Sequence, residues 1–126
     1  MRTVIVTAIG SFSADIVIKK CRENGIRVIG CDVYPREWIA DAGNVEAFYQ
    51  VPYATDTDHY IGTMMSLCRK EGAEAVIPLT DAEIDVFNLH RDEFSEINVT
   101  LSMSDKACIG LCRDKMELYR YLEEHM

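Results

Sequence analysis

The residues best suited to chemistry follow an apolar run in the second half of the chain. Thr80, Asp81 and Glu83 supply one hydroxyl and two carboxylates directly after residues 75–79. Such groups bind an amine or a hydroxyl of a ligand. The same Thr-Asp-Ala-Glu pattern is a capping box, in which Thr80 and Glu83 satisfy the first amides of a helix. We expect Thr80 and Glu83 to cap, which leaves Asp81 as the carboxylate more open to a ligand. Neither role excludes the other.

A second candidate group combines a short loop with an acid further along the chain. Residues 8–13 place small side chains where a dinucleotide-binding fingerprint has three glycines, and Asp32 follows Gly10 at about the spacing of a ribose-binding acid. Because Gly10 is the only glycine there, we expect a tight turn between a strand and a helix, with an NAD site as the alternative. Backbone amides near Gly10 and Ser11 could also hold an anion at the helix start.

Lys115 is the third candidate, because its charge conflicts with its position. It follows Asp114, a good N-cap, and a cation at a helix start opposes the helix dipole. A bound phosphate would explain the lysine, and so would simple solvation. The other reactive residue types form no recognisable group. The five cysteines contain no C-x-x-C pair and His59, His90 and His125 are scattered, so we expect reduced thiols, no metal site and no nucleophilic catalysis.

The composition is that of one ordinary soluble domain. The 126 residues are 48% hydrophobic and 27% charged, and 21 acidic residues against 13 basic ones give a net charge of -8. Since the basic residues are scattered as well as outnumbered, nucleic acid is not an expected partner. Neither a membrane-spanning run nor a signal-peptide pattern is present, so we expect no membrane partner and a cytoplasmic location.

Strands and helices alternate along the sequence. Apolar runs predict strands over 3–8, 26–31, 47–51, 75–79 and 99–103, of which 47–51 is expected at an edge. Periodic patterns and caps predict helices over 13–23, 56–70, 84–89, 105–112 and 114–126. This alternation predicts an α/β fold, a Rossmann-like doubly wound parallel sheet of about five strands in a single three-layer domain. Ligands of such sheets bind beyond the carboxyl ends of the strands, which nominates the loops after Ala8, Asp32, Leu79 and Met103.

The last predicted helix has a start signal but no stop signal. Asp114 and Glu117 form a capping box, whereas no Gly, Asn or Pro follows. Met116, Tyr119 and Leu122 form an apolar stripe that needs a covering surface. We therefore expect the chain to be a piece of something larger, with the stripe covered by further lobes, a partner or a second copy.

Several segments together resemble the N-terminal domain of ATP-grasp ligases, especially carbamoyl-phosphate-synthase-like proteins and related carboxylate-amine ligases. The resemblance covers essentially the whole chain and is carried by residues 4–10, 28–32, 49–52, 76–83 and 112–115. It implies that residues 1–113 form a pre-ATP-grasp domain on the acceptor-substrate side of an active site. Residues 114–126 would be the first helix leading toward ATP-grasp lobes.

The same resemblance implies a reaction and a set of site residues. Enzymes of the family phosphorylate a carboxylate to an acylphosphate, which an amine or another nucleophile attacks. Lys115 would reach the phosphates of MgATP. The residues facing a small carboxylate or amine substrate would be Gly10, Ser11, Asp32, Thr80, Asp81 and Glu83.

Two departures from the family pattern limit what the chain is expected to do alone. The glycine-rich first loop is reduced to Gly10, and no phosphate loop, second nucleotide lysine or pair of metal-binding acids can be placed in 126 residues. We therefore expect a truncated ligase that binds no cofactor and catalyses nothing without its C-terminal lobes. The alternatives are a freestanding dinucleotide-binding Rossmann module that uses Gly10 and Asp32, and a protein-interaction domain or homodimer that uses the last helix.

Overall fold

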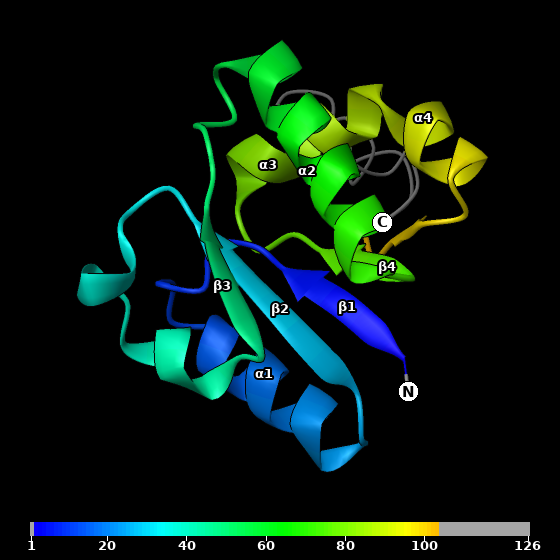
Figure 1. Ribbon diagram of the computed structural model, residues 1–126. Coiled ribbons are helices and arrows are strands. Elements are labelled where there is room, and N and C mark those ends of the chain that lie inside the picture. Colours follow the sequence, from blue (N-terminus) through cyan, green and yellow to red (C-terminus); the bar gives the residue numbers. More distant parts are fainter. Residues whose placement is uncertain (1, 104–126) are drawn as a thin grey trace, which may run out of the picture.

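The computed structural model describes residues 2–103. In this part of the chain, five parallel strands form one sheet in the order β3-β2-β1-β4-β5 (Figure 1). The strands are β1 (Thr3–Val6), β2 (Arg27–Asp32), β3 (Ala47–Gln50), β4 (Ala75–Ile77) and β5 (Thr100–Leu101). The helices are α1 (Ala14–Glu23), α2 (Thr57–Glu71), α3 (Asp81–Leu89) and α4 (Arg91–Glu96), with two short 3-10 helices, η1 (Arg36–Trp38) and η2 (Ala40–Asn44). The predicted Rossmann-like parallel sheet is confirmed. The helices predicted over 105–112 and 114–126 lie outside the described residues.

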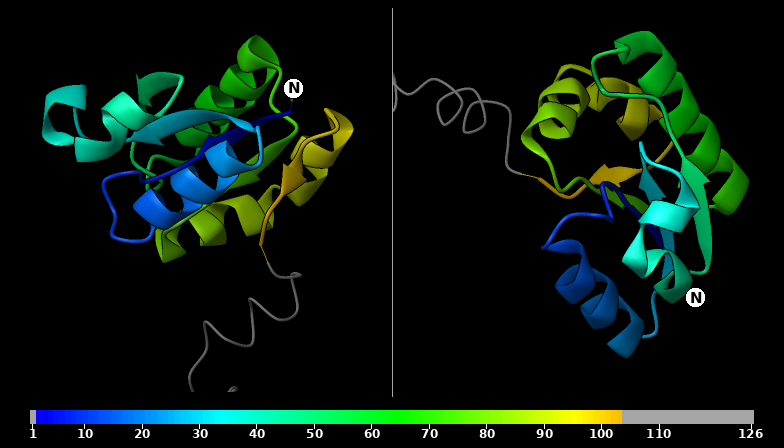
Figure 2. Two further views of the ribbon diagram at one scale, coloured as in Figure 1. Left: turned by 90° about the horizontal axis from the view of Figure 1, so that it is seen from below. Right: turned by 90° about the vertical axis from the view of Figure 1, so that its left-hand side faces the viewer.

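The sheet is the middle of three layers. Alternate side chains of β1 point to opposite faces, so Val4 and Val6 pack with α1 and η2, whereas Ile5 packs with α2, α3 and α4. In Figure 1, α1 lies below the sheet and α2 to α4 lie above it, and Figure 2 shows the two sides from other directions. All four residues of β1 are buried. Burial on both faces explains why the inner strands are continuous apolar runs.

A glycine in β2 lets the loop after β1 lie against the sheet. A Cβ atom on Gly30 would lie 2.7 Å from Ile9 Cδ1 and 3.0 Å from Val45 Cγ1, so a side chain there would force Ile9 or Val45 to shift. Ile9 is almost completely buried at this contact. Close packing of this kind leaves little room for the loop to shift. Gly30 therefore helps to fix the position of the loop that carries Gly10 and Ser11.

Most helix ends follow the predicted signals. Gly72 ends α2 in the left-handed conformation, with φ of 66°, and Thr80 caps α3 by accepting the Glu83 amide at 3.4 Å. The helix predicted over 84–89 begins earlier, at Asp81, because the capping residues belong to its first turn. Helix α4 was not predicted. It has six residues and buries only Phe94, so it leaves no apolar period in the sequence.

The connections leave the sheet in two directions from its centre. The chain leaves β1 through α1 on one face to reach β2, and it leaves β4 through α3 and α4 on the other face to reach β5. The carboxyl ends of β1 and β4 therefore flank the switch point, where ligands of open α/β sheets bind. Among residues 2–103, none of the helices is both long enough and apolar enough to cross a membrane.

Candidate functional site

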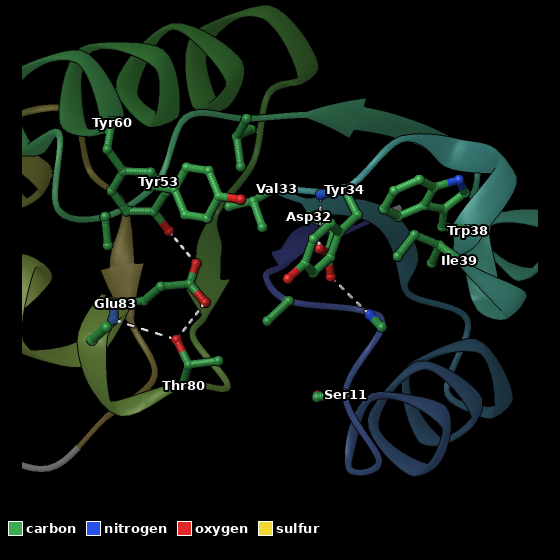
Figure 3. Close-up of a pocket in the computed structure, with 15 residues that line it drawn as sticks. Ser11, Asp32, Val33, Tyr34, Trp38, Ile39, Tyr53, Tyr60, Thr80 and Glu83 are labelled. Carbon is green, nitrogen blue, oxygen red and sulfur yellow. Dashed lines mark hydrogen bonds between the residues drawn. The ribbon is translucent and has the colours of Figure 1, made fainter.

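A cleft of about 540 Å³ lies at this switch point (Figure 3). Its walls come from the segments that follow β1, β2, β3 and β4. Loops after the first, second and fourth strands were predicted to bind a ligand, whereas the segment after β3 was not. The predicted site residues that line the cleft are Gly10, Ser11, Asp32, Thr80 and Glu83. Asp81 is exposed in the first turn of α3 and does not belong to the lining, and Lys115 lies outside the described residues.

Glu83 is a buried carboxylate held by two neutral hydroxyls. Only 8% of the residue is exposed. One carboxylate oxygen accepts a hydrogen bond from the Tyr60 hydroxyl, and the other accepts one from Thr80 Oγ1 at 2.8 Å. Burial and the charge of Glu83 raise the pKa of Tyr60, so its hydroxyl remains a donor. The fifteen described residues that line the cleft include no lysine, arginine or histidine. The negative charge of Glu83 therefore has no cationic partner in this lining.

Asp32 ties two walls of the cleft together. It is 7% exposed, and its Oδ2 accepts the Gly10 amide at 2.9 Å while its Oδ1 accepts the Tyr34 amide at 3.1 Å. A Cβ atom on Gly10 would lie 3.0 Å from Ile39 Cδ1 and 3.1 Å from Asp32 Oδ2. The one glycine of this loop thus allows the backbone to approach the acid closely. The Gly10 amide, one of those suggested for a bound anion, donates to Asp32, and the anion site and the NAD alternative stay predictions.

The loop after β1 has two features that lower the stability of the fold. Ala8 has φ of 49°, which is uncommon for a residue with a Cβ atom. Ser11 Oγ is buried and has no hydrogen-bond partner among the described residues. An unsatisfied buried hydroxyl costs about 1–3 kcal/mol. Backbone strain and orphaned polar atoms concentrate at binding sites, which supports a functional role for this loop.

Four aromatic residues also line the cleft, and sequence reasoning missed them. Tyr34 and Trp38 stack with ring centroids 5.7 Å apart and an angle of 29° between the rings. Tyr53 and Tyr60 come from the segment after β3 and the first turn of α2. A signal was present, because Tyr34 and Tyr53 are each next to a proline directly after a strand. Figure 3 shows Tyr34 and Trp38 across the cleft from Glu83.

The buried cysteines near the cleft are not poised as nucleophiles. Burial, with the charges of Glu83 and Asp32, raises the pKa of the Cys31 thiol well above its usual range. Burial raises the pKa of Cys68 to about 11. Both are therefore protonated at neutral pH, and the thiolate is the reactive form. Cys21, Cys31 and Cys68 are unpaired thiols, as predicted, while Cys108 and Cys112 lie outside the described residues.

The fold and the cleft define a Rossmann-like α/β domain, and solved structures share the fold. Urea amidolyase from K. lactis matches 98% of this chain with a TM-score of 0.71 at 20% identity. The biotin carboxylase subunit of pyruvate carboxylase matches 98% with a TM-score of 0.69 at 17% identity. Glycinamide-RNase-transformylase T from Mycobacterium tuberculosis matches 79% with a TM-score of 0.59 at 16% identity. The chain spans only 7%, 28% and 26% of those three proteins, in that order.

The family itself is shown by sequence. Residues 4–102 match the model described as PylC-like, N-terminal domain, so the chain belongs to this family. No curated protein sequence matches the chain significantly. The predicted relationship to the N-terminal domains of ATP-grasp ligases is confirmed by the family and by the shared fold.

The described residues do not fit MgATP, the group that this relationship implies. The cleft offers no lysine or arginine to the phosphates, and residues 2–103 contain no cluster of three His, Cys, Asp or Glu side chains suited to a metal ion. The loop amide of Gly10 is already bound to Asp32.

Proposed function

We propose that this chain is the substrate-side domain of an ATP-dependent carboxylate-amine ligase and that its cleft binds the amine substrate. The observation that carries the proposal is the state of Glu83. This carboxylate lies in the lining of a cleft at the switch point, and its two bound donors, Tyr60 and Thr80, are neutral. An ammonium group would supply the missing positive charge.

Charge favours the amine over the carboxylate of the two substrates that the sequence left open. The lining contains the carboxylates of Asp32 and Glu83 and no basic side chain among its described residues. A substrate carboxylate would meet like charge there, whereas an ammonium would form charge-assisted hydrogen bonds, about twice as strong as neutral ones. The proposal therefore assigns the amine to this cleft and the carboxylate to the ATP-grasp lobes.

The neighbouring hydroxyls orient the acid for this role. Tyr60 and Thr80 each donate to a different oxygen of Glu83, which fixes the plane of the carboxylate. A carboxylate oxygen can accept more than one hydrogen bond, so Glu83 retains acceptor capacity for a ligand. Ser11 Oγ, which lacks a partner among the described residues, is a further group that a ligand could satisfy.

The remaining chemistry is assigned outside the described residues. On this proposal Lys115 and the ATP-grasp lobes would hold MgATP, which would supply a phosphoryl group to the carboxylate with release of ADP. The amine, after losing a proton, would then attack the acyl carbon and displace inorganic phosphate. The chain alone would bind amine without turnover. Support comes from the family, which links the domain to ligases, and from the cleft, which lacks groups for phosphate.

Steady-state kinetics of an enzyme that joins this domain to ATP-grasp lobes tests the assignment. Glu83→Gln should raise the KM for the amine by about tenfold or more, because it removes a charge-assisted contact, while the KM for ATP stays within about twofold. Lys115→Ala should raise the KM for ATP and leave the KM for the amine within about twofold. An unchanged amine KM in Glu83→Gln would contradict the role of the cleft, and unchanged ATP kinetics in Lys115→Ala would contradict the role of that lysine.

A further inference from the structure

We infer that Tyr34, Trp38 and Tyr53 form a second subsite, which selects an amine that carries a flat apolar group. The inference rests on the proposed function for the ammonium group of the ligand. It adds the kind of substituent that the amine carries. Glu83 would bind the nitrogen, and the aromatic subsite would contact the remainder of the molecule. Neither the family description nor the fold specifies such a group.

The two ends of the cleft differ in chemistry. Figure 3 shows Glu83, Tyr60 and Thr80 on one side, with Tyr53 next to Tyr60 and its ring turned toward the cleft, and Tyr34 and Trp38 on the other side, with Asp32 beside Tyr34. The first side presents the oxygens of Glu83, Tyr60 and Thr80. The second side presents the rings of Tyr34 and Trp38 beside Asp32, whose two oxygens already accept the Gly10 and Tyr34 amides. A ligand that satisfies both sides has a polar cationic end and an apolar end. Sites with mostly apolar walls and a few convergent polar groups are typical of small-molecule binding.

The aromatic side is held in place before any ligand binds. The Tyr34 amide donates to Asp32 Oδ1, and the Trp38 amide donates to the Pro35 carbonyl at 3.0 Å. Pro35, with φ of -68°, is the N-cap of η1. The stacked rings of Tyr34 and Trp38 are thus carried by a backbone segment that is hydrogen-bonded to Asp32 and within its own turn. Such preorganisation reduces the entropy lost when a ligand binds.

All three aromatic residues of the subsite are exposed although they line the cleft. The exposed fractions are 48% for Tyr34, 72% for Trp38 and 58% for Tyr53. Buried aromatic partners elsewhere, such as Phe87 and Phe94, are fully covered and pack edge to face. A flat apolar group placed on the exposed ring faces would remove apolar surface from water and gain stacking contacts. The geometry therefore favours an aromatic or similarly flat group over a bare alkyl amine.

Trp38 provides a direct measurement, because it is the only tryptophan of the 126 residues. The probes are 2-phenylethylamine, ethylamine, which lacks the ring, and 2-phenylethanol, which lacks the amine. Acrylamide quenching of Trp38 fluorescence should fall as 2-phenylethylamine saturates the cleft. Ethylamine, followed by NMR shifts, should bind about tenfold more weakly and leave the quenching unchanged.

Substitution of the stacking partner sharpens the test while Trp38 remains as the reporter. Tyr34→Ala should weaken binding of 2-phenylethylamine about 3- to 10-fold and leave ethylamine within about twofold, because it removes one ring contact. Tyr53→Ala should act in the same direction, which keeps the test valid if Tyr34→Ala fails to fold. Ile16→Ala is the control, since Ile16 is an exposed apolar residue of α1 outside the cleft lining.

The outcomes separate this inference from the proposed function. Equal affinities for ethylamine and 2-phenylethylamine, or Trp38 quenching that no probe changes, would overturn the aromatic subsite. If 2-phenylethanol protects Trp38 as well as 2-phenylethylamine does, the aromatic subsite is supported and the amine role of Glu83 fails. Protection by 2-phenylethylamine alone supports both.

Discussion

Helix α2 connects two glutamate–tyrosine pairs that differ in one component. Near its start, Tyr60 donates a hydrogen bond to Glu83 at the carboxyl ends of the strands. At its end, Glu71 accepts one from Tyr49 at 2.6 Å, close to the amino end of β2. Both glutamates are largely buried and both tyrosines donate through the hydroxyl. The two pairs therefore form a matched comparison within one domain.

The two pairs differ in positive charge, because a cationic side chain contacts Glu71 and none in the cleft lining contacts Glu83. Arg27 Nη2 lies 2.8 Å from Glu71 Oε2, and the Lys70 ammonium lies 5.0 Å above the Tyr49 ring. The hydrogen bonds from Tyr49 and Arg27 lower the pKa of Glu71. Glu83 instead has the Thr80 hydroxyl at 2.8 Å. A complete ion pair serves structure, whereas a buried acid held by neutral donors beside a cleft has its charge left for a ligand. On the proposed function, the comparison thus distinguishes a structural acid, Glu71, from a binding acid, Glu83.

Removal of the tyrosine hydroxyl should lower the free energy of unfolding more at Tyr60, beside the cleft, than at Tyr49. Tyr60→Phe leaves the Glu83 carboxylate with Thr80 alone, so we expect a loss of about 2 kcal/mol in the free energy of unfolding. Tyr49→Phe leaves Glu71 with Arg27, and we expect a loss of about 1 kcal/mol. Urea unfolding at neutral pH measures both.

Tyr53→Phe is the control for this pair, because Tyr53 is exposed in the same cleft. Its free energy of unfolding should stay within about 0.5 kcal/mol of the parent. A Tyr49→Phe loss equal to or greater than that of Tyr60→Phe would break the comparison, since it would mean that Arg27 does not compensate.

Low pH should weaken the pair formed by Glu71 with Tyr49 and Arg27. We expect a smaller change in stability than in the tyrosine variants. The pKa of Glu71 is lowered in the folded state from its ordinary value of 4.5, first by the Tyr49 hydrogen bond and then by Arg27. Its contribution to stability is therefore fully present above pH 4.5 and is lost as the pH falls through the folded-state pKa. Glu71→Gln should lose less stability than the parent below pH 4.5. Parallel acid unfolding curves of the two proteins would contradict this role.

Local signals in the sequence predicted most of the fold. Continuous apolar runs identified all five strands, and Gly72 and Thr80 marked a helix end and a helix start that the structure retains. Helix α4 and the 3-10 helices carry no such signal, because each is short and buries at most one residue. Apolar periodicity detects burial, so elements with little burial are missed.

The candidate site was only partly predictable, because its contacts join distant segments. Gly10 and Asp32 were both nominated, but their hydrogen bond spans 22 positions. Tyr60 and Glu83 are 23 positions apart, and no local pattern pairs them. Asp81 was the carboxylate expected to be more open to a ligand, yet Glu83 is the one that faces the cleft. Trp38 belongs to a short 3-10 helix without an apolar period, so nothing in the sequence placed its ring there.

The most direct test of the central claim is an NMR titration of this chain with n-butylamine. The parent should bind saturably, with shifts concentrated in the cleft. Glu83→Gln should weaken the affinity by about tenfold or more, while the matched Glu71→Gln should leave it within about twofold. Equal affinities of the parent and Glu83→Gln, or equal losses in the two variants, would contradict the assignment of Glu83 as the amine-binding acid.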